Sequence, residues 1–171
     1  MTKPRPRHIY SLLTVLILAA LTSSIRLHPS DPRAEALDAF LETVPGPILL
    51  GERNSRSLVF INAADHPRLQ LEFARRNSLP EDLMAQVLEM PDQRPVPAGL
   101  TNAIVVSEER LFEPDGRTLM AITPIALNKE QTEALFGTIY AASNEERLAI
   151  VLVWMKVLDG EWVVQKTARM S

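Results

Sequence analysis

Apolar and polar positions divide the chain into a helical first half and a strand-rich second half. Between residues 33 and 44 the apolar side chains recur at i, i+3, i+4 and i+7, and Asp31-Pro32 precedes them as an N-cap followed by proline at the first helical position. The spacing predicts an amphipathic helix that packs on a sheet and ends at Pro45-Gly46-Pro47. Its apolar face carries Leu37, Phe40, Leu41 and Val44.

Residues 46–76 combine two short apolar runs with an ambiguous segment. Residues 48–50 and 58–61 are apolar and are separated by a polar stretch, so we expect the two strands of a hairpin. From Leu69 to Phe73 the apolar positions alternate, and helix and strand patterns compete. Asp65-His66-Pro67 in front is typical of a helix start, which favours a helix here.

A second helix is predicted after residue 78. Ser78-Leu79-Pro80-Glu81 fits a capping box in which Glu81 reaches back to the Ser78 amide, and Pro91 ends the helix. With Pro95 and Pro97, Pro91 makes the next ten residues an extended loop. The expected apolar face consists of Leu79, Leu83, Met84, Val87 and Leu88.

From residue 102 onward the apolar and β-branched content predicts strands. Asp159-Gly160 between two such runs indicates a hairpin, and it sets Trp162 opposite Val157 and Trp154 opposite Gln165. Pro124 implies a bulge or an edge. The predicted fold class is α+β, with helices packed on an antiparallel β-sheet meander. The expected strands are 104–106, 118–127, 133–141, 147–158 (apolar on both faces, hence central) and 161–166.

The N-terminus has the pattern of an export signal. Lys3, Arg5 and Arg7 precede a mostly uncharged run from residue 9 to residue 25. We therefore expect a signal peptide or an uncleaved signal-anchor helix over residues 1–26, a linker over 27–32, and one extracytoplasmic domain over 33–171. Cleavage and retention both remain open, because the small residues after the apolar run match a cleavage site imperfectly. The positive-inside rule places the N-terminus in the cytoplasm and the domain outside, in the periplasm or secreted.

Composition narrows the function classes. The chain has 171 residues and no cysteine, which excludes disulfide scaffolds, cysteine nucleophiles and thiolate metal sites. Its net charge of −3 conceals a division: four of the 18 basic residues and no acid lie in the first 28 positions, so the remainder carries 14 basic and 21 acidic side chains, or −7. An acidic domain of this kind argues against nucleic-acid binding.

Part of the second half resembles a group of small, exported bacterial proteins of no known activity. The resemblance covers residues 94–168 and rests on Val96-Pro97, residues 104–109, residues 123–135 and Asp159-Gly160-Glu161-Trp162. It implies a helical N-terminal part and a closing antiparallel sheet. The chain lacks the group's aromatic-rich insertion between residues 112 and 118 and its glycines between 141 and 146. The final Gly-x-Trp strand is also similar to that of cone-shaped α+β folds of the nuclear-transport-factor kind.

Candidate chemistry is sparse. His66 has only its chain neighbour Asp65 as a carboxylate partner and is interpreted as a helix-start residue. Glu108 and Glu109 point to opposite sides if extended, and Glu113-Pro114-Asp115-Gly116 is typical of a turn, so these acids are interpreted as solvated. Trp154 and Trp162 are assigned to core or rim packing. We predict no catalytic, cofactor-binding or metal-binding residue, and no cofactor.

These observations leave three function classes open. The first is a non-enzymatic, membrane-tethered or secreted module that binds another envelope protein. The second is a small-ligand-binding or hydrolytic domain with a pocket between the N-terminal helices and the sheet. The third is an immunity or inhibitor protein, for which the charge of −7 would favour a basic target.

Overall fold

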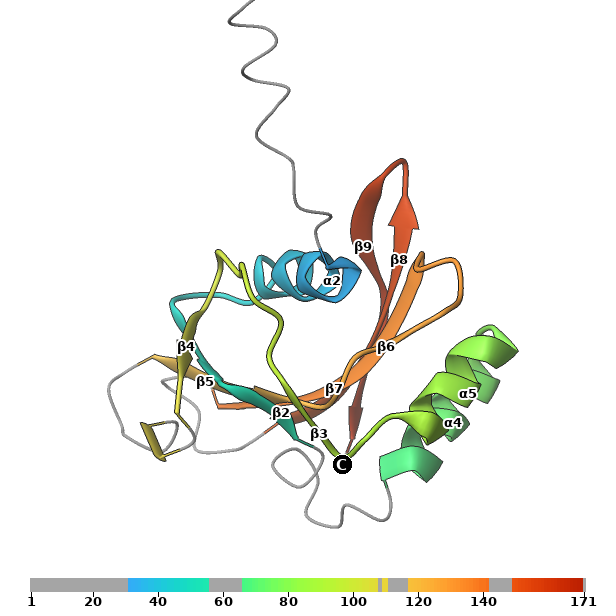
Figure 1. Cartoon of the computed structure of the whole chain (residues 1–171), viewed down its shortest axis with the longest axis horizontal. Helices are drawn as coiled ribbons and strands as arrows, with labels where there is room; N and C mark the ends of the chain where they lie inside the picture. The colour runs from blue at the N-terminus through green and yellow to red at the C-terminus, as the bar shows by residue number, and fades with distance from the viewer. Residues whose placement is uncertain (1–30, 56–65, 108, 111–116, 142–148, 171) are drawn as a thin grey trace, which may run out of the picture. The chain divides into compact units, whose positions relative to one another are not determined.

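A computed structural model describes residues 31–55, 66–107, 109–110, 117–141 and 149–170 of the chain (Figure 1). Over these residues the fold is α+β, with three helices and a mixed sheet. The expected signal or anchor segment lies outside the described residues. In chain order the elements are α2 (Pro32–Leu41), β1 (Ile48–Gly51), β2 (Arg53–Ser55), α4 (His66–Arg76), α5 (Glu81–Glu89), β3 (Gln93–Pro95), β4 (Ile104–Val106), β5 (Thr118–Ile122), β6 (Ala126–Leu127), β7 (Glu133–Ala141), β8 (Ala149–Leu158) and β9 (Glu161–Met170).

The main sheet combines parallel and antiparallel pairing. Its order is β4-β1-β5-β7-β8-β9, and β6 also pairs with β7. From β5 to β9 the pairing is antiparallel, as predicted, whereas β1 runs parallel to both β4 and β5. The expectation of an antiparallel meander is therefore wrong for β4, which pairs in parallel with β1 and is not a neighbour of β5. Strands from far along the chain occupy both edges of β1, so it cannot form the predicted hairpin with residues 58–61, which themselves lie outside the described residues.

Alternate residues of the central strands face two different apolar clusters. On β8, Val151 and Val153 belong to the cluster beneath α2, whereas Leu152 between them belongs to the cluster beneath α4 and α5. The sheet is thus covered by α2 on one face and by α4 and α5 on the other (Figure 1). This confirms that β8 is central and covered on both faces, as its uninterrupted apolar sequence predicted.

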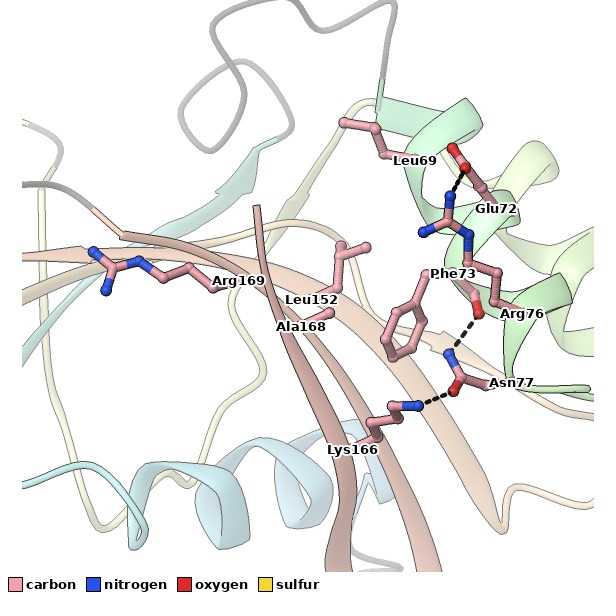
Figure 2. A pocket seen from close by; sticks show the side chains of 9 residues that line it. All are labelled: Leu69, Glu72, Phe73, Arg76, Asn77, Leu152, Lys166, Ala168 and Arg169. Atoms are coloured by element: carbon pink, nitrogen blue, oxygen red, sulfur yellow. Dashed lines mark hydrogen bonds and ion pairs between the residues drawn. The ribbon is translucent and has the colours of Figure 1, made fainter. Parts of the chain in front are cut away.

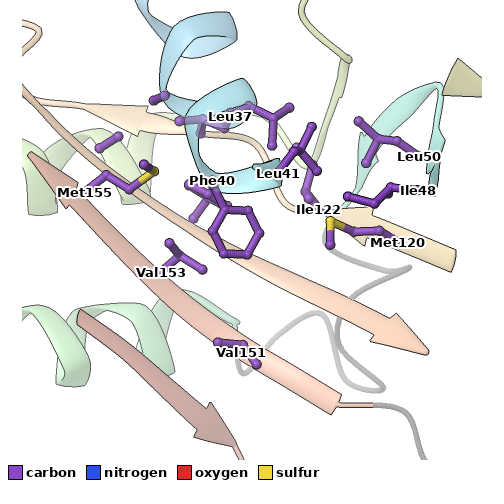
Figure 3. Close-up of a cluster of buried hydrophobic side chains, with 14 of the residues drawn as sticks. Leu37, Phe40, Leu41, Ile48, Leu50, Met120, Ile122, Val151, Val153 and Met155 are labelled. Carbon is purple, nitrogen blue, oxygen red and sulfur yellow. The ribbon is translucent and has the colours of Figure 1, made fainter. Parts of the chain in front are cut away.

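Helix α2 forms as the sequence predicts. Asp31 is its N-cap and its carboxylate accepts a 2.9 Å hydrogen bond from the Arg33 amide. Leu37, Phe40 and Leu41 are buried against the sheet (Figure 3). The Phe40 ring meets that of Phe136 on β7 edge to face, with 5.4 Å between the ring centroids.

Ser78 ends α4 and does not begin α5, so the capping-box prediction is wrong. Its φ of +53° places it in the left-handed region. The Ser78 amide donates to the Arg75 carbonyl and the Leu79 amide to the Ala74 carbonyl, which together form a Schellman motif. Helix α5 has Pro80 as its N-cap and no side-chain capping bond. The helix predicted over the ambiguous segment is confirmed as α4.

On α5 the predicted apolar face is partly correct. Leu83 and Val87 are buried against the sheet, whereas Leu88 is 59% exposed. The Asp82 carboxylate accepts a hydrogen bond of 2.6 Å from the amide of Lys129, which joins α5 to the turn between β6 and β7. The proline-rich segment after α5 is not all loop, because β3 pairs with β2 in a small second sheet.

The predicted bulge at Pro124 is present. Residues 118–127 form two strands, β5 and β6, and the register against β7 shifts by one residue between them. The Thr123 amide donates to the Gly137 carbonyl, and the Thr123 hydroxyl accepts from the Gly137 amide at 2.9 Å. The hydroxyl oxygen therefore replaces the backbone acceptor that the bulge displaces.

The β8–β9 hairpin turns at Asp159-Gly160 as predicted, with φ of +54° and +88°. Val157 lies opposite Trp162, which confirms that part of the register. Trp154 pairs with Lys166 and not with Gln165, because a bulge interrupts the ladder between Trp154 and Met155. As a result, the side-chain alternation of β9 shifts by one residue at Gln165.

Candidate functional site

Helix α4 and strand β9 enclose the groove that we consider the candidate functional site (Figure 2). Its volume is about 450 Å³. We call it the α4–β9 groove. It is lined by Leu69, Glu72, Phe73, Arg76 and Asn77 of α4 and the turn after it, by Leu152 of β8, and by Lys166, Ala168 and Arg169 of β9.

The floor of the groove is apolar. Leu152 is fully buried and Phe73 is 7% exposed, and both belong to the cluster beneath α4 and α5. Leu69 and Ala168 are half-buried against the same cluster. Helical spacing places Leu69, Phe73 and Arg76 on one stripe of α4, so the helix presents apolar carbon to the sheet and charge at the rim.

The rim of the groove is charged and hydrogen-bonded. Lys166 donates from Nζ to Oδ1 of Asn77 at 2.6 Å, and Asn77 donates from Nδ2 to the Phe73 carbonyl at 2.8 Å. Arg76 forms an ion pair with Glu72, one turn earlier on α4 (Figure 2). The Arg76 and Glu72 side chains are 75% and 50% exposed, so the rim opens to solvent.

The bulge at Gln165 orients this end of β9. Beyond it Lys166 pairs with Trp154 and Ala168 with Leu152, and these partners face α4 and α5. Arg169 pairs with Val151 and therefore lies on the opposite face, and Figure 2 shows its guanidinium directed away from α4. Arg169 thus borders the groove at the strand edge without projecting into it.

The groove offers charged and hydrogen-bonding side chains around an apolar floor. Two cations, one carboxylate and one amide surround apolar carbon, and no serine, threonine, cysteine or histidine lines the groove over the described residues. Within the same residues no three His, Cys, Asp or Glu side chains could hold a metal ion.

Most of the chemistry-bearing residues that the sequence offered lie outside the part of the chain whose side chains the structure describes. His66 begins α4, and its side chain is not described. Glu109 is exposed in a short turn after β4, and Glu108, Glu113 and Asp115 lie outside the described residues.

The tryptophans pack on opposite faces of the sheet. Trp162 contacts the cluster beneath α2, and Trp154 contacts the cluster beneath α4 and α5. The Trp154 indole donates from Nε1 to Oε2 of Glu133 at 3.0 Å, and Lys156 pairs with Oε1 of the same carboxylate at 3.2 Å. Both side chains thus pack against the core and do not form a shared platform.

Nothing in the sequence pattern singles out Arg76, Asn77 or Lys166. An arginine at a helix end and a lysine on an amphipathic strand are ordinary surface residues in a sequence. No local sequence pattern predicts the groove, because Asn77 and Lys166 lie 89 positions apart in the sequence.

Comparisons with protein-family models, curated proteins and solved structures return no match to this chain. The resemblance to small exported proteins therefore stays a prediction from the sequence. Among the helices that the structure describes, none is both long enough and apolar enough to cross a membrane.

Proposed function

We propose that the chain is a non-enzymatic protein-binding module that works outside the cytoplasm, tethered or secreted, and holds an extended segment of another envelope protein along β9. One observation carries this proposal: β9 is ten residues long, has a strand neighbour on one side only among the described residues, and borders a groove with an apolar floor. Strand addition to such an edge gives affinity through main-chain hydrogen bonds, and adjacent pockets give specificity through alternate side chains.

The opposite edge of the main sheet is a weaker candidate. Strand β4 exposes Ile104 and Val105, at 53% and 46%, but it has three residues. A short edge supplies few main-chain hydrogen bonds to a partner. The longer β9 edge, with its groove, therefore supports strand addition better.

Site-specific photo-crosslinking tests the proposal. A photoreactive amino acid at Thr167, exposed on β9, is introduced into the full-length protein in its native membranes, and the matched control carries it at exposed Glu89 on α5. We expect one envelope protein to be crosslinked from Thr167 and not from Glu89, with the linkage mapping to one short segment of that partner. Identical products from both positions, or none from Thr167, would contradict the proposal.

A small-ligand site is the second candidate, and the groove volume favours it. Small-molecule pockets commonly measure roughly 300–1,000 Å³, and the groove of about 450 Å³ falls within that range. It also lies between a helix and the sheet, as the sequence analysis expected for this class. A thermal-shift screen of small anionic and neutral compounds tests this reading: stabilisation lost on Ala168→Trp would support it.

A further inference from the structure

The charge of the α4–β9 groove is opposite in sign to that of the domain around it. From residue 29 to the C-terminus the chain carries 14 basic and 21 acidic side chains. The groove holds Arg76 and Lys166 against one acid, Glu72, whose carboxylate pairs with Arg76, so Lys166 leaves it with a net positive charge. A local positive patch on a negative domain is a feature of specific electrostatic complementarity, because non-specific attraction would follow the net charge.

We propose that β9 and the groove bind an extended acidic segment of a partner protein. The backbone of that segment pairs with the free edge of β9, an apolar side chain lies on Leu69 and Ala168, and a carboxylate is bound by Lys166. This inference rests on the proposed function and specifies the chemistry of the partner.

Lys166 is placed to receive the carboxylate. Its ammonium carries three donors, and the one partner it has among the described residues is the Asn77 carboxamide. That bond holds Nζ beside the turn that ends α4, so the charge is positioned before a partner arrives. Part of the side-chain ordering therefore precedes binding, which lowers its entropic cost.

The apolar floor selects an extended chain. Side chains of a strand alternate between the two faces of a sheet, so a segment added to β9 would direct every second side chain toward the α4 side. Leu69 and Ala168, both half-buried, line that side with apolar carbon, and Arg76 lies at its rim. An alternating sequence with an acidic residue two positions from an apolar one fits this spacing.

Fluorescence anisotropy with designed peptides tests the inference. The probes are fluorescein-labelled ten-residue peptides that alternate valine and threonine and carry either two aspartates, two asparagines or two lysines at central positions. The full-length protein is held in nanodiscs of uncharged lipid. We expect the aspartate peptide to bind about tenfold or more tightly than the lysine peptide, with the asparagine peptide between them. Methylating alternate backbone nitrogens of the aspartate peptide should abolish binding, since a methylated amide cannot donate.

Two charge-reversal variants distinguish an effect of the groove from an effect of the net charge of the protein. Lys166→Glu should remove or invert the preference for the aspartate peptide, whereas Lys129→Glu, which makes the same charge change in the turn between β6 and β7, should leave it unchanged. Equal effects of the two substitutions, or equal affinity of the three peptides, would overturn the inference.

Binding of dodecanoate in the groove without any peptide binding would assign the groove to a small anionic amphiphile. Dimerisation in sedimentation without peptide binding would assign the edge to a second copy. Both results overturn the inference.

Failure of this inference is distinguishable from failure of the proposed function. If Thr167 crosslinks one partner segment and the peptides show no charge preference, the protein-binding function is supported and the preference for an acidic segment is wrong. If Thr167 crosslinks nothing and no peptide binds, both are wrong.

Discussion

Asp38 joins α2 to the loop before β4. Its carboxylate accepts from the amides of Thr101 and Asn102, each at 2.9 Å, and from the Thr101 hydroxyl at 2.5 Å. Burial raises the pKa of this carboxyl, but the hydrogen bonds outweigh burial and hold the pKa below its ordinary value of 3.8. The folded state therefore stabilises the charged form of Asp38 more than the unfolded state does.

We predict that Asp38→Asn lowers the free energy of unfolding near neutral pH by about 1–3 kcal/mol, because the amide offers one acceptor oxygen where the carboxylate offers two. A group with a depressed folded pKa stabilises the fold fully above its unfolded pKa and loses that contribution as the pH falls. The difference between wild type and variant should therefore shrink below pH 3.8. Urea unfolding across this range measures it.

The control is Glu89→Gln, which neutralises an exposed carboxylate on α5. A loss of stability equal to that of Asp38→Asn, or a difference that does not depend on pH, would show that Asp38 does not act through its charged form.

At the scale of elements, the β5–β6 bulge depends on one hydroxyl. Thr123 is fully buried, and its Oγ1 is the acceptor for the Gly137 amide. We predict that Thr123→Val, which has nearly the same shape, costs about 1–3 kcal/mol because a buried N–H loses its acceptor. Thr123→Ser keeps the oxygen and should cost less. Chemical unfolding of the two variants checks the order, and a serine variant as unstable as the valine variant would refute the role of the hydroxyl.

The β8–β9 turn depends on backbone freedom at Gly160. Its φ is +88°, and a Cβ added there would meet no atom within 4 Å, so substitution affects conformation and not packing. We predict that Gly160→Ala costs about 1–2 kcal/mol, the usual penalty for a side chain in the left-handed region. Asp159→Asn should be nearly neutral, because asparagine tolerates that region. Thermal unfolding compares them, and an alanine variant as stable as wild type would contradict the assignment.

Local patterns predicted the elements whose partners are close in sequence. The α2 face, the Asp159-Gly160 turn and the bulge at Pro124 follow from spacing and turn chemistry within a few residues. The position of β1 does not, because periodicity reports which residues are buried and not which distant strand covers them. Ser78 was misassigned for a related reason: a serine before a helix fits an N-cap, but here the preceding helix uses it as its left-handed end.

The candidate groove was less predictable than the fold. Its apolar floor consists of Phe73 and Leu152, which a sequence identifies as core residues without indicating that they border an opening. Its cation, Lys166, faces α4 only because of the bulge at Gln165, and simple alternation from the turn assigns that strand position to the other face.

At the scale of the whole molecule, one sheet joins two apolar clusters. The cluster beneath α2 contains Val151 and Val153, and the cluster beneath α4 and α5 contains Leu152 from between them. Loss of either helical layer exposes residues of the same strand, so we predict a single cooperative unfolding transition.

The two tryptophans report the two layers separately. With Trp154→Phe the remaining indole, Trp162, senses the α2 side, and with Trp162→Phe the indole of Trp154 senses the other side. Urea transitions followed by fluorescence should have the same midpoint as far-UV circular dichroism in each variant. A lower midpoint for the Trp154 probe than for circular dichroism would show that the α4–α5 layer unfolds independently.

The extra residue Gln165 divides β9 into two halves, and a change of pairing affects the half after it more than the half before it. A substitution alters one contact, but regular pairing of Gln165 with Trp154 would remove the bulge and exchange the faces of every residue after it, carrying Thr167 and Arg169 toward α4 and Lys166 and Ala168 toward α2. Selection on the groove would therefore act on the register of this strand before it acts on composition. Relatives that diverge freely at Lys166 or Ala168 should still keep the register that sets these two positions opposite Trp154 and Leu152.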